Sequence, residues 1–211
     1  KKLIGTKVLP AYEKLYSHLQ ALNGNGKNEN GLYYYKNGKE YFAGKLPDNG
    51  GVYVVPAFAG LGAPYWDMYA RGTIVGLTRG SGRNHIIRAA LESIAYQTND
   101  ILETMRNATG MELHTLKVDG GASKNRFLMQ FQADISEIHV LKTDETEATA
   151  RGAAFLAGLS CGLWKDRAEL SALSHTAEIF TPAMSEDKRR KNLDGWRLAV
   201  NCTLNWGKDS L

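Results

Sequence analysis

Residues 115–135, TLKVDGGASKNRFLMQFQADI, hold the pattern that decides the fold class of this chain. Thr115–Val118 is short and typical of a strand. The turn Asp119-Gly120-Gly121-Ala122 follows, because paired glycines interrupt both helices and strands. From about Lys124 to Ile135, large apolar side chains recur on one side of a predicted helix. A strand that leads through a glycine turn into a helix is the repeating unit of α/β proteins.

The same alternation of short strands and helices extends outward from this stretch. Further strands are predicted at 52–55, 73–77 and 138–141, and helices at about 84–108 and 147–159. The tail from Lys165 is predicted to form two helical pieces, split near residues 180–182. The helix at 84–108 carries the apolar stripe that should face the core, with Thr98 filling its gap: Ile87, Leu91, Ile94, Ile101 and Met105.

Strands joined through helices are expected to run parallel, with right-handed connections. In open sheets of this kind, ligands bind beyond the carboxyl ends of the strands. That rule directs attention to the loop that follows Val118.

The glycine turn has the chemistry of a phosphate or nucleotide contact. Gly120 and Gly121 lack Cβ atoms, so the backbone can approach a ligand closely. Free N–H groups at the start of the following helix favour phosphate, and the Asn125 amide could hydrogen-bond a base or a ribose. The competing interpretation is a tight corner with Asn125 in solvent. The spacing by itself favours that plainer interpretation, because Gly-Gly after a strand is common.

Other polar and aromatic residues have simpler structural interpretations. Tyr65 and Trp66, in a loop of glycines and aromatics, are expected to cap the core, and Asp67 to pair with Arg71. His85 is expected at the surface or as a cap of the long helix. Two further expectations are a buried Cys161 and a solvated helix face for the basic run 188–191.

Composition excludes several classes of protein. The chain has 211 residues, 43% apolar and 23% charged, with a formal net charge of +4, values that are ordinary for a globular protein. Lys and Arg alternate with Asp and Glu, so no basic stripe indicates nucleic acid. No apolar run reaches the ~20 residues of a membrane helix. Two cysteines without metal-ligand spacing favour a reducing, cytoplasmic location.

From about Tyr41 to Trp206 the chain closely resembles the glycerol kinases of the FGGY carbohydrate kinase family. The segment from Gly72 to Glu92 fits a signature pattern of that family. The stretches that carry the resemblance are Asn49–Phe58, Gly60–Asp67, His85–Thr98 and Val118–Asp134. A match this long is far more specific than a glycine pair.

The resemblance implies an α/β fold of the actin-like ATPase (ribonuclease H-like) type, with a mixed sheet and flanking helices. Residues 41–211 would form the C-terminal ATP-binding domain, and residues 1–40 remain an unassigned N-terminal segment. By motif position, Gly121 and Asn125 match two nucleotide-binding residues of the family, and Gly120 lies beside them. Because of this resemblance, a nucleotide contact becomes the preferred interpretation of the turn, in place of a plain corner.

The implied reaction is phosphoryl transfer from ATP to glycerol, with Mg²⁺ bridging the phosphates. No catalytic residue and no metal ligand is assigned to this chain, because the family's catalytic Asp lies in a Gly-Asp-Gln-Gln context that this sequence lacks. The family's polyol contacts lie outside the chain as well. The chain is therefore expected to be part of a longer protein, and to be inactive without the rest of that protein. The resemblance also implies a homo-oligomer when the enzyme is intact, without nucleic acid or membrane partners.

Two alternatives stay open at this point. The chain could belong to a kinase for another polyol or a ketose, because the sugar contacts are missing. Departures from the common family pattern at Ala59, Met68, Lys142-Thr143 and Arg151 loosen the substrate assignment slightly. The chain could also be a catalytically silent ATP-binding or regulatory module.

Overall fold

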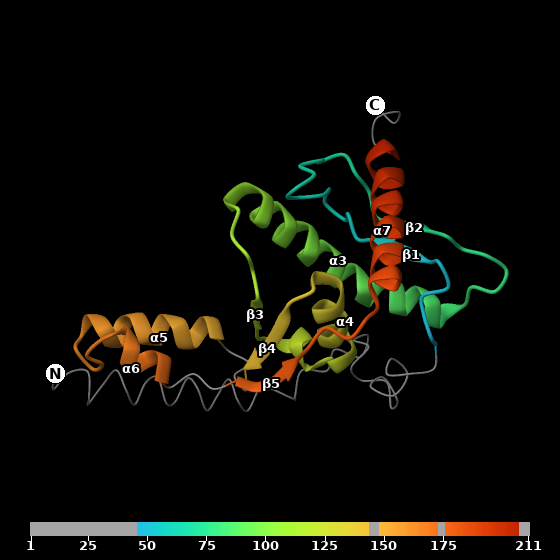
Figure 1. Ribbon diagram of the computed structural model, residues 1–211. Helices are drawn as coiled ribbons and strands as arrows, with labels where there is room; N and C mark the ends of the chain where they lie inside the picture. Colours follow the sequence, from blue (N-terminus) through green and yellow to red (C-terminus); the bar gives the residue numbers. More distant parts are fainter. Residues whose placement is uncertain (1–45, 144–147, 173–175, 207–211) are drawn as a thin grey trace, which may run out of the picture.

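The computed structural model describes residues 46–143, 148–172 and 176–206, and Figure 1 shows their arrangement. The segment 1–40 lies outside the described residues. Along the chain, the elements are β1 (Tyr53–Val55), β2 (Thr73–Val75), α3 (Arg83–Thr109), β3 (Thr115–Val118), the 3₁₀ turn η3 (Gly121–Lys124), α4 (Arg126–Ser136), β4 (His139–Thr143), α5 (Ala148–Ser160), α6 (Arg167–Ala172), β5 (Thr176–Phe180) and α7 (Glu186–Trp206). Within these ranges, no helix combines the length and the apolar character needed to cross a membrane.

The described strands form two sheets, one antiparallel and one mixed. β1 pairs antiparallel with β2, and the second sheet has the order β3-β4-β5. β3 and β4 run parallel, as expected for strands joined through a helix, whereas β5 runs antiparallel to β4. The mixed sheet with flanking helices agrees with the prediction from the resemblance.

The prediction of helix through residues 165–180 is wrong in its second half. Residues 167–172 are helical, but Thr176–Phe180 is strand β5. Phe180 lies opposite Val140 in the register and is buried. The segment can complete its backbone hydrogen bonds along the open edge of β4, and this tertiary pairing outweighs a local pattern that favours helix.

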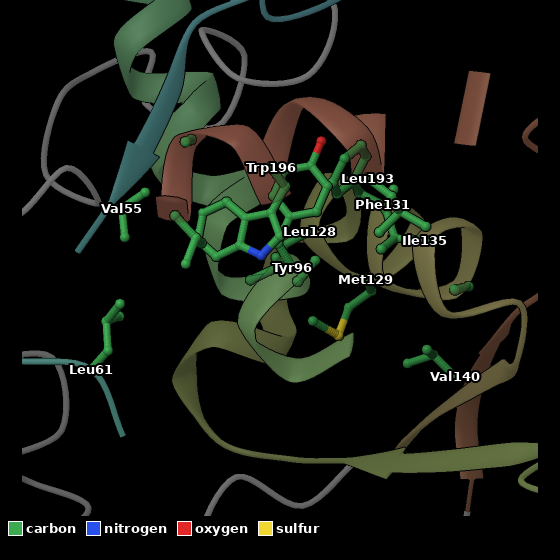
Figure 2. Packing of buried hydrophobic residues seen from close by; sticks show 14 of the residues in the cluster. Val55, Leu61, Tyr96, Leu128, Met129, Phe131, Ile135, Val140, Leu193 and Trp196 are labelled. Carbon is green, nitrogen blue, oxygen red and sulfur yellow. The ribbon is translucent and has the colours of Figure 1, made fainter. Parts of the chain in front are cut away.

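The core lies where α3, α4 and α7 meet, and its centre is a group of aromatic rings. Trp196 of α7 stacks on Tyr96 of α3 with ring centroids 5.1 Å apart. Phe131 of α4 meets Tyr96 edge-on, at 5.5 Å and 89°. Figure 2 shows these rings surrounded by aliphatic side chains from β1, α4 and α7. Aromatic contacts of this kind stabilise a core by about 0.5–1.5 kcal/mol beyond the area they bury.

Helix α3 begins and ends within one residue of its prediction, but its orientation differs from the prediction. The stripe expected to face the core is partly in solvent: Ile94, Ile101 and Met105 are 44%, 45% and 50% exposed. The buried face consists of Ala89, Glu92, Ser93, Ala95, Tyr96, Asn99 and Leu102. The helix thus presents a mixed face to the described core, and no described residue buries its apolar face.

The basic run in α7 is not uniformly solvated, which corrects that expectation. The Arg189 side chain is only 12% exposed. Its Nε donates to the Ile135 carbonyl at 2.8 Å, and Nη1 lies 3.1 Å from a carboxylate oxygen of Glu137. Arg189 therefore ties the start of α7 to the end of α4, and its charge is matched by carboxylates at the edge of the core.

Helices α5 and α6 lie next to one another, apart from α3 and α7 (Figure 1). The Trp164 ring occupies the space beside Gly158, where any Cβ would overlap it. Trp164 also meets Phe155 edge-on at 5.2 Å. Cys161 is exposed, so the prediction of a buried thiol is wrong: its apolar neighbours lie at the surface of a small helical unit.

Candidate nucleotide-binding turn

The turn 119–125 lies at the carboxyl end of β3, as the sequence indicates. β3 and β4 are parallel, so Val118 and Thr143 end their strands at the same edge of the sheet. The strand is followed by Gly120, then by η3 and α4. The chain therefore places its glycine pair where ligands bind in open α/β sheets.

The two glycines of the turn are required for different reasons. Gly120 has φ 80° and ψ −177°, a conformation that is essentially restricted to glycine. Gly121 does not have a positive φ, and a Cβ built on it would meet no heavy atom within 4 Å. The backbone geometry thus explains Gly120, whereas nothing in the described structure requires a glycine at 121. Open space at that position is what a closely approaching ligand needs.

Asn125 is the N-cap of α4. Its Oδ1 accepts a hydrogen bond from the Leu128 N–H at 3.1 Å. This contact uses the oxygen of the amide, and its Nδ2 has no hydrogen bond to the described residues that would prevent it from donating to a ligand. The residue can cap the helix and hold a ligand at the same time.

The helix begins later than predicted, and this changes the phosphate argument. Gly121–Lys124 form a 3₁₀ turn, and α4 starts at Arg126 rather than near Lys124. The Ser123 hydroxyl donates to the Gly120 carbonyl at 2.7 Å and holds this turn closed. Asn125 therefore already pairs with one of the free N–H groups at the start of α4, and the 3₁₀ turn separates that start from the end of β3.

The aromatic loop before β2 is fixed by a carboxylate that the sequence did not single out. Asp100 Oδ2 accepts from the Tyr65 hydroxyl at 2.9 Å and from the Trp196 indole N–H at 2.8 Å. Burial raises the pKa of Asp100, and these two hydrogen bonds partly oppose that rise. Tyr65 is therefore anchored to the core as expected. Trp66 is 78% exposed and does not cap it.

The expected pair between Asp67 and Arg71 does not form, because each binds backbone atoms instead. Asp67 Oδ1 accepts from the N–H groups of Tyr69 and Ala70, at 2.8 and 3.0 Å. Arg71 donates to the carbonyls of Met68 and Ala70. Both side chains stabilise the shape of the loop.

A second carboxylate fixes the start of β1 against α3. Glu92 is buried and accepts from Asn49 Nδ2 at 2.9 Å and from Arg88 Nε at 2.7 Å. Burial raises its pKa, and Arg88 opposes this effect. The sequence contains a signal for it, an Arg and a Glu four residues apart on one helix. His85 acts as a cap, as predicted: its Nδ1 accepts from the Gly82 N–H at 3.1 Å.

Comparison with known proteins identifies the family. The profile for the C-terminal domain of the FGGY family of carbohydrate kinases matches residues 18–161, and the chain belongs to this family. It is 62% identical over 167 residues to a glycerol kinase from Clostridium perfringens (strain 13 / Type A), which covers 79% of this chain and 33% of that protein. A glycerol kinase from Petrotoga mobilis is 59% identical over 167 residues, again 79% of this chain and 34% of the relative.

Solved structures give the same result for the fold. The crystal structure of Plasmodium falciparum glycerol kinase with ADP aligns with a TM-score of 0.70 and 39% identity, covering 79% of this chain and 33% of that one. A ligand-bound xylulose kinase from Lactobacillus acidophilus aligns with a TM-score of 0.64 at 24% identity, over 76% of this chain and 32% of that one, which supports the fold alone. The predicted actin-like ATPase fold is confirmed. The chain spans about a third of the length of the relatives it matches.

Proposed function

We propose that this chain supplies the nucleotide-binding part of an ATP-dependent glycerol kinase, which converts ATP and glycerol to ADP and glycerol 3-phosphate. The observation that carries the proposal is 62% identity to a glycerol kinase over 167 residues. Support from the chain itself comes from the turn after β3. There, the absence of a side chain at Gly121 leaves space for a ligand, although the fold does not require a glycine at this position. Asn125 keeps an amide donor beside this space.

In this proposal each residue of the turn has a distinct role. Gly120 gives the backbone its left-handed bend, Gly121 lets the nucleotide approach the backbone, and Asn125 Nδ2 donates to its ribose or base. The Plasmodium falciparum glycerol kinase was solved with ADP, which supports a nucleotide as the ligand of this fold.

Mg²⁺ would neutralise charge on the phosphates during transfer. Within the described ranges, no group of three or more His, Cys, Asp or Glu side chains could hold a metal ion. Phosphate oxygens and waters commonly provide most of the ligands of Mg²⁺ at such sites. In this proposal the phosphates of the nucleotide, rather than a separate cluster of side chains, would supply most of the protein-independent ligands of Mg²⁺.

The proposed domain spans residues 41–211. The family profile ends at residue 161, but α7 beyond it contributes Trp196, Ala199 and Val200 to the buried core. For the intact enzyme we propose a cytoplasmic homo-oligomer. Sedimentation of the full-length protein would measure its assembly, and a monomer would contradict that part of the proposal.

Calorimetry and a coupled assay on the purified chain test the proposal together. We expect the chain to bind ADP, and to release no ADP from ATP when glycerol and Mg²⁺ are supplied, because its resemblance places the base and the polyol contacts outside it. The Gly121→Ala variant is the matched control for binding at the turn. Absence of ADP binding contradicts the nucleotide role. Binding that never leads to turnover, even with the remainder of a kinase present, favours the silent module.

A further inference from the structure

Arg88 is a partly buried arginine of α3 whose guanidinium contacts three separate parts of the chain. Its side chain is 18% exposed, and its Nε donates to the Glu92 carboxylate of the same helix at 2.7 Å. Its Nη1 donates to the Leu46 carbonyl, before β1, at 2.6 Å. Its Cζ lies over the Phe127 ring of α4, 4.7 Å from the centroid. A planar guanidinium can form hydrogen bonds in its plane and stack on a ring at the same time, which a lysine ammonium cannot.

A buried network holds this guanidinium in place. The Glu92 side chain is only 3% exposed, and its Oε2 accepts from Asn49 Nδ2 at 2.9 Å. Asn49 is itself buried, and its Oδ1 accepts from the Gly51 N–H at 2.9 Å. The Asn49 carbonyl accepts from the Val52 N–H at 3.1 Å. The position of Arg88 over the ring is therefore fixed by hydrogen bonds that extend to the start of β1.

Phe127 carries the contact to the candidate nucleotide-binding turn. It is the second residue of α4 and directly precedes Leu128, whose N–H donates to Oδ1 of the N-cap Asn125. The Phe127 ring also stacks on Phe131, one helical turn further on, with centroids 5.8 Å apart. The first turn of α4 is thus held by Arg88 from α3 and by Phe131 from its own helix. Asn125 is attached to this turn by its capping hydrogen bond.

We propose that Arg88 is a positioning residue of the nucleotide site: it holds Phe127, and thereby fixes the orientation in which Asn125 presents its amide to the nucleotide. The inference rests on the proposed function, that the turn after β3 binds a nucleotide. Arg88 itself does not touch the nucleotide in this arrangement. Because the same guanidinium binds the segment before β1, a nucleotide that orders Asn125 should also stabilise the hydrogen bonds made by Asn49, since coupling between two sites is reciprocal.

The plainer role for Arg88 is to strengthen the packing of α3 on α4 without any effect on the turn. Arg106 provides a control for that role, because it joins the same two helices at their other end. Its Nη2 donates to the carbonyl of Ser136, the last residue of α4, at 2.9 Å. Arg106→Ala removes this contact entirely, and it should loosen the packing of the helices without changing the first turn of α4.

Calorimetry with ADP on the purified 211-residue chain is the first test. Arg88→Lys and Phe127→Leu should each weaken ADP binding about three- to tenfold, because each removes the stacked contact. The double variant should bind no more weakly than the weaker single variant, since both substitutions remove the same interaction. Arg106→Ala should stay within about twofold of wild type. Wild-type affinity in both single variants, or additive losses in the double variant, would overturn the proposal.

Hydrogen exchange reports the position of the turn directly. Without nucleotide, the Leu128 amide should exchange about tenfold faster in Arg88→Lys than in wild type, and at the wild-type rate in Arg106→Ala. Saturating ADP should slow exchange at the Gly51 and Val52 amides in wild type but not in Arg88→Lys. A wild-type Leu128 rate in Arg88→Lys, or undiminished protection of Gly51 and Val52, would contradict the positioning role.

Two features of the design keep the outcomes separate. Arg88→Lys leaves a positive charge beside Glu92, so no buried carboxylate loses its partner. Circular dichroism checks that each variant folds, and Phe127→Leu, which leaves the ion pair intact, decides the question if Arg88→Lys does not fold. A wild-type chain that binds no ADP would contradict the proposed function. The Leu128 exchange rate needs no nucleotide, so it would still show whether Arg88 holds the turn.

Discussion

Replacing Gly120 and Gly121 by alanine, one at a time, distinguishes the glycine that the backbone conformation of the turn requires from the glycine that is proposed to admit the nucleotide. Gly120 has φ 80° and ψ −177°, and forcing an alanine into that region costs about 1–3 kcal/mol. Alanine also lowers the conformational entropy of the unfolded chain, which offsets about 0.4–1 kcal/mol of that loss in stability. The net loss should be about 1–2 kcal/mol. At roughly 2–4 °C per kcal/mol for a protein of this size, Tm should fall by about 2–8 °C.

Gly121→Ala should behave differently because its position is open. With no positive φ and no atom within 4 Å of the added Cβ, its stability should change by no more than about 0.5 kcal/mol. The methyl group would nevertheless stand where the nucleotide is proposed to approach. We expect ADP affinity to fall by about tenfold or more, which corresponds to about 1.4 kcal/mol.

Thermal melts with and without ADP, together with calorimetry, measure both effects on the same samples. The combination that supports the reasoning is a lower Tm for Gly120→Ala, and an unchanged Tm with weaker ADP binding for Gly121→Ala. Equal destabilisation by the two substitutions would refute the structural distinction. Wild-type ADP affinity in Gly121→Ala would refute the proposed approach of the nucleotide.

Three further substitutions test neighbouring parts of the structure. Asn125→Asp keeps a capping oxygen but loses the amide donor, so its stability should stay within about 0.5 kcal/mol of wild type on denaturation, while calorimetry should show weaker ADP binding. Asn125→Ala should bind ADP weakly and also lose about 1 kcal/mol of stability. Unchanged ADP binding in Asn125→Asp would contradict the contact. Gly195→Ala would place a Cβ against the Tyr53 hydroxyl and ring. Urea denaturation should therefore show a free energy of unfolding lower by about 1–3 kcal/mol, despite the better helix propensity of alanine. A more stable variant would contradict this packing. Burial raises the pKa of Asp100 above its ordinary value of 3.8, so the folded state prefers the protonated carboxyl, and wild-type stability loses that contribution as pH rises from 3.8 through the raised pKa. Asn at this position does not titrate, so the stability of Asp100→Asn relative to wild type should be greater at pH 7 than at pH 4, and a constant difference across a pH series of urea titrations would argue against the shift.

Local pattern was sufficient for the elements whose signals are strong. Strand β3 coincides with its prediction at Thr115–Val118, and α3 extends one residue beyond 84–108 at each end. In both cases glycine marks the boundary: Gly110 has φ 65° as the C-cap of α3, and Gly120 bends the chain after β3. Strand β5 was missed because its pairing partner is far away in the chain.

The features of the candidate site can likewise be divided into those that the sequence predicts and those that it does not. The glycine turn could be found from the sequence, because it is encoded within a few residues, whereas the cap at Asn125 was not among the predictions. Its assignment to a nucleotide required the family resemblance, since the spacing alone favoured a plain corner. The Asp100 contacts had no local signal: its partners lie 35 and 96 positions away. Contacts of that kind depend on tertiary packing, which a single-sequence pattern does not contain.

The orientation of α3 is the most informative disagreement between pattern and structure. A period of 3.6 placed Ile94, Ile101 and Met105 toward a core, yet they are about half exposed, while polar Glu92 and Asn99 are buried on another face. Misjudged periodicity does not explain this, because the helix is present with the expected bounds and the stripe is regular. A helix of a free-standing domain would be expected to bury its most apolar face. The sequence of α3 is therefore better explained by burial of this face against something other than the described residues than by the described core alone.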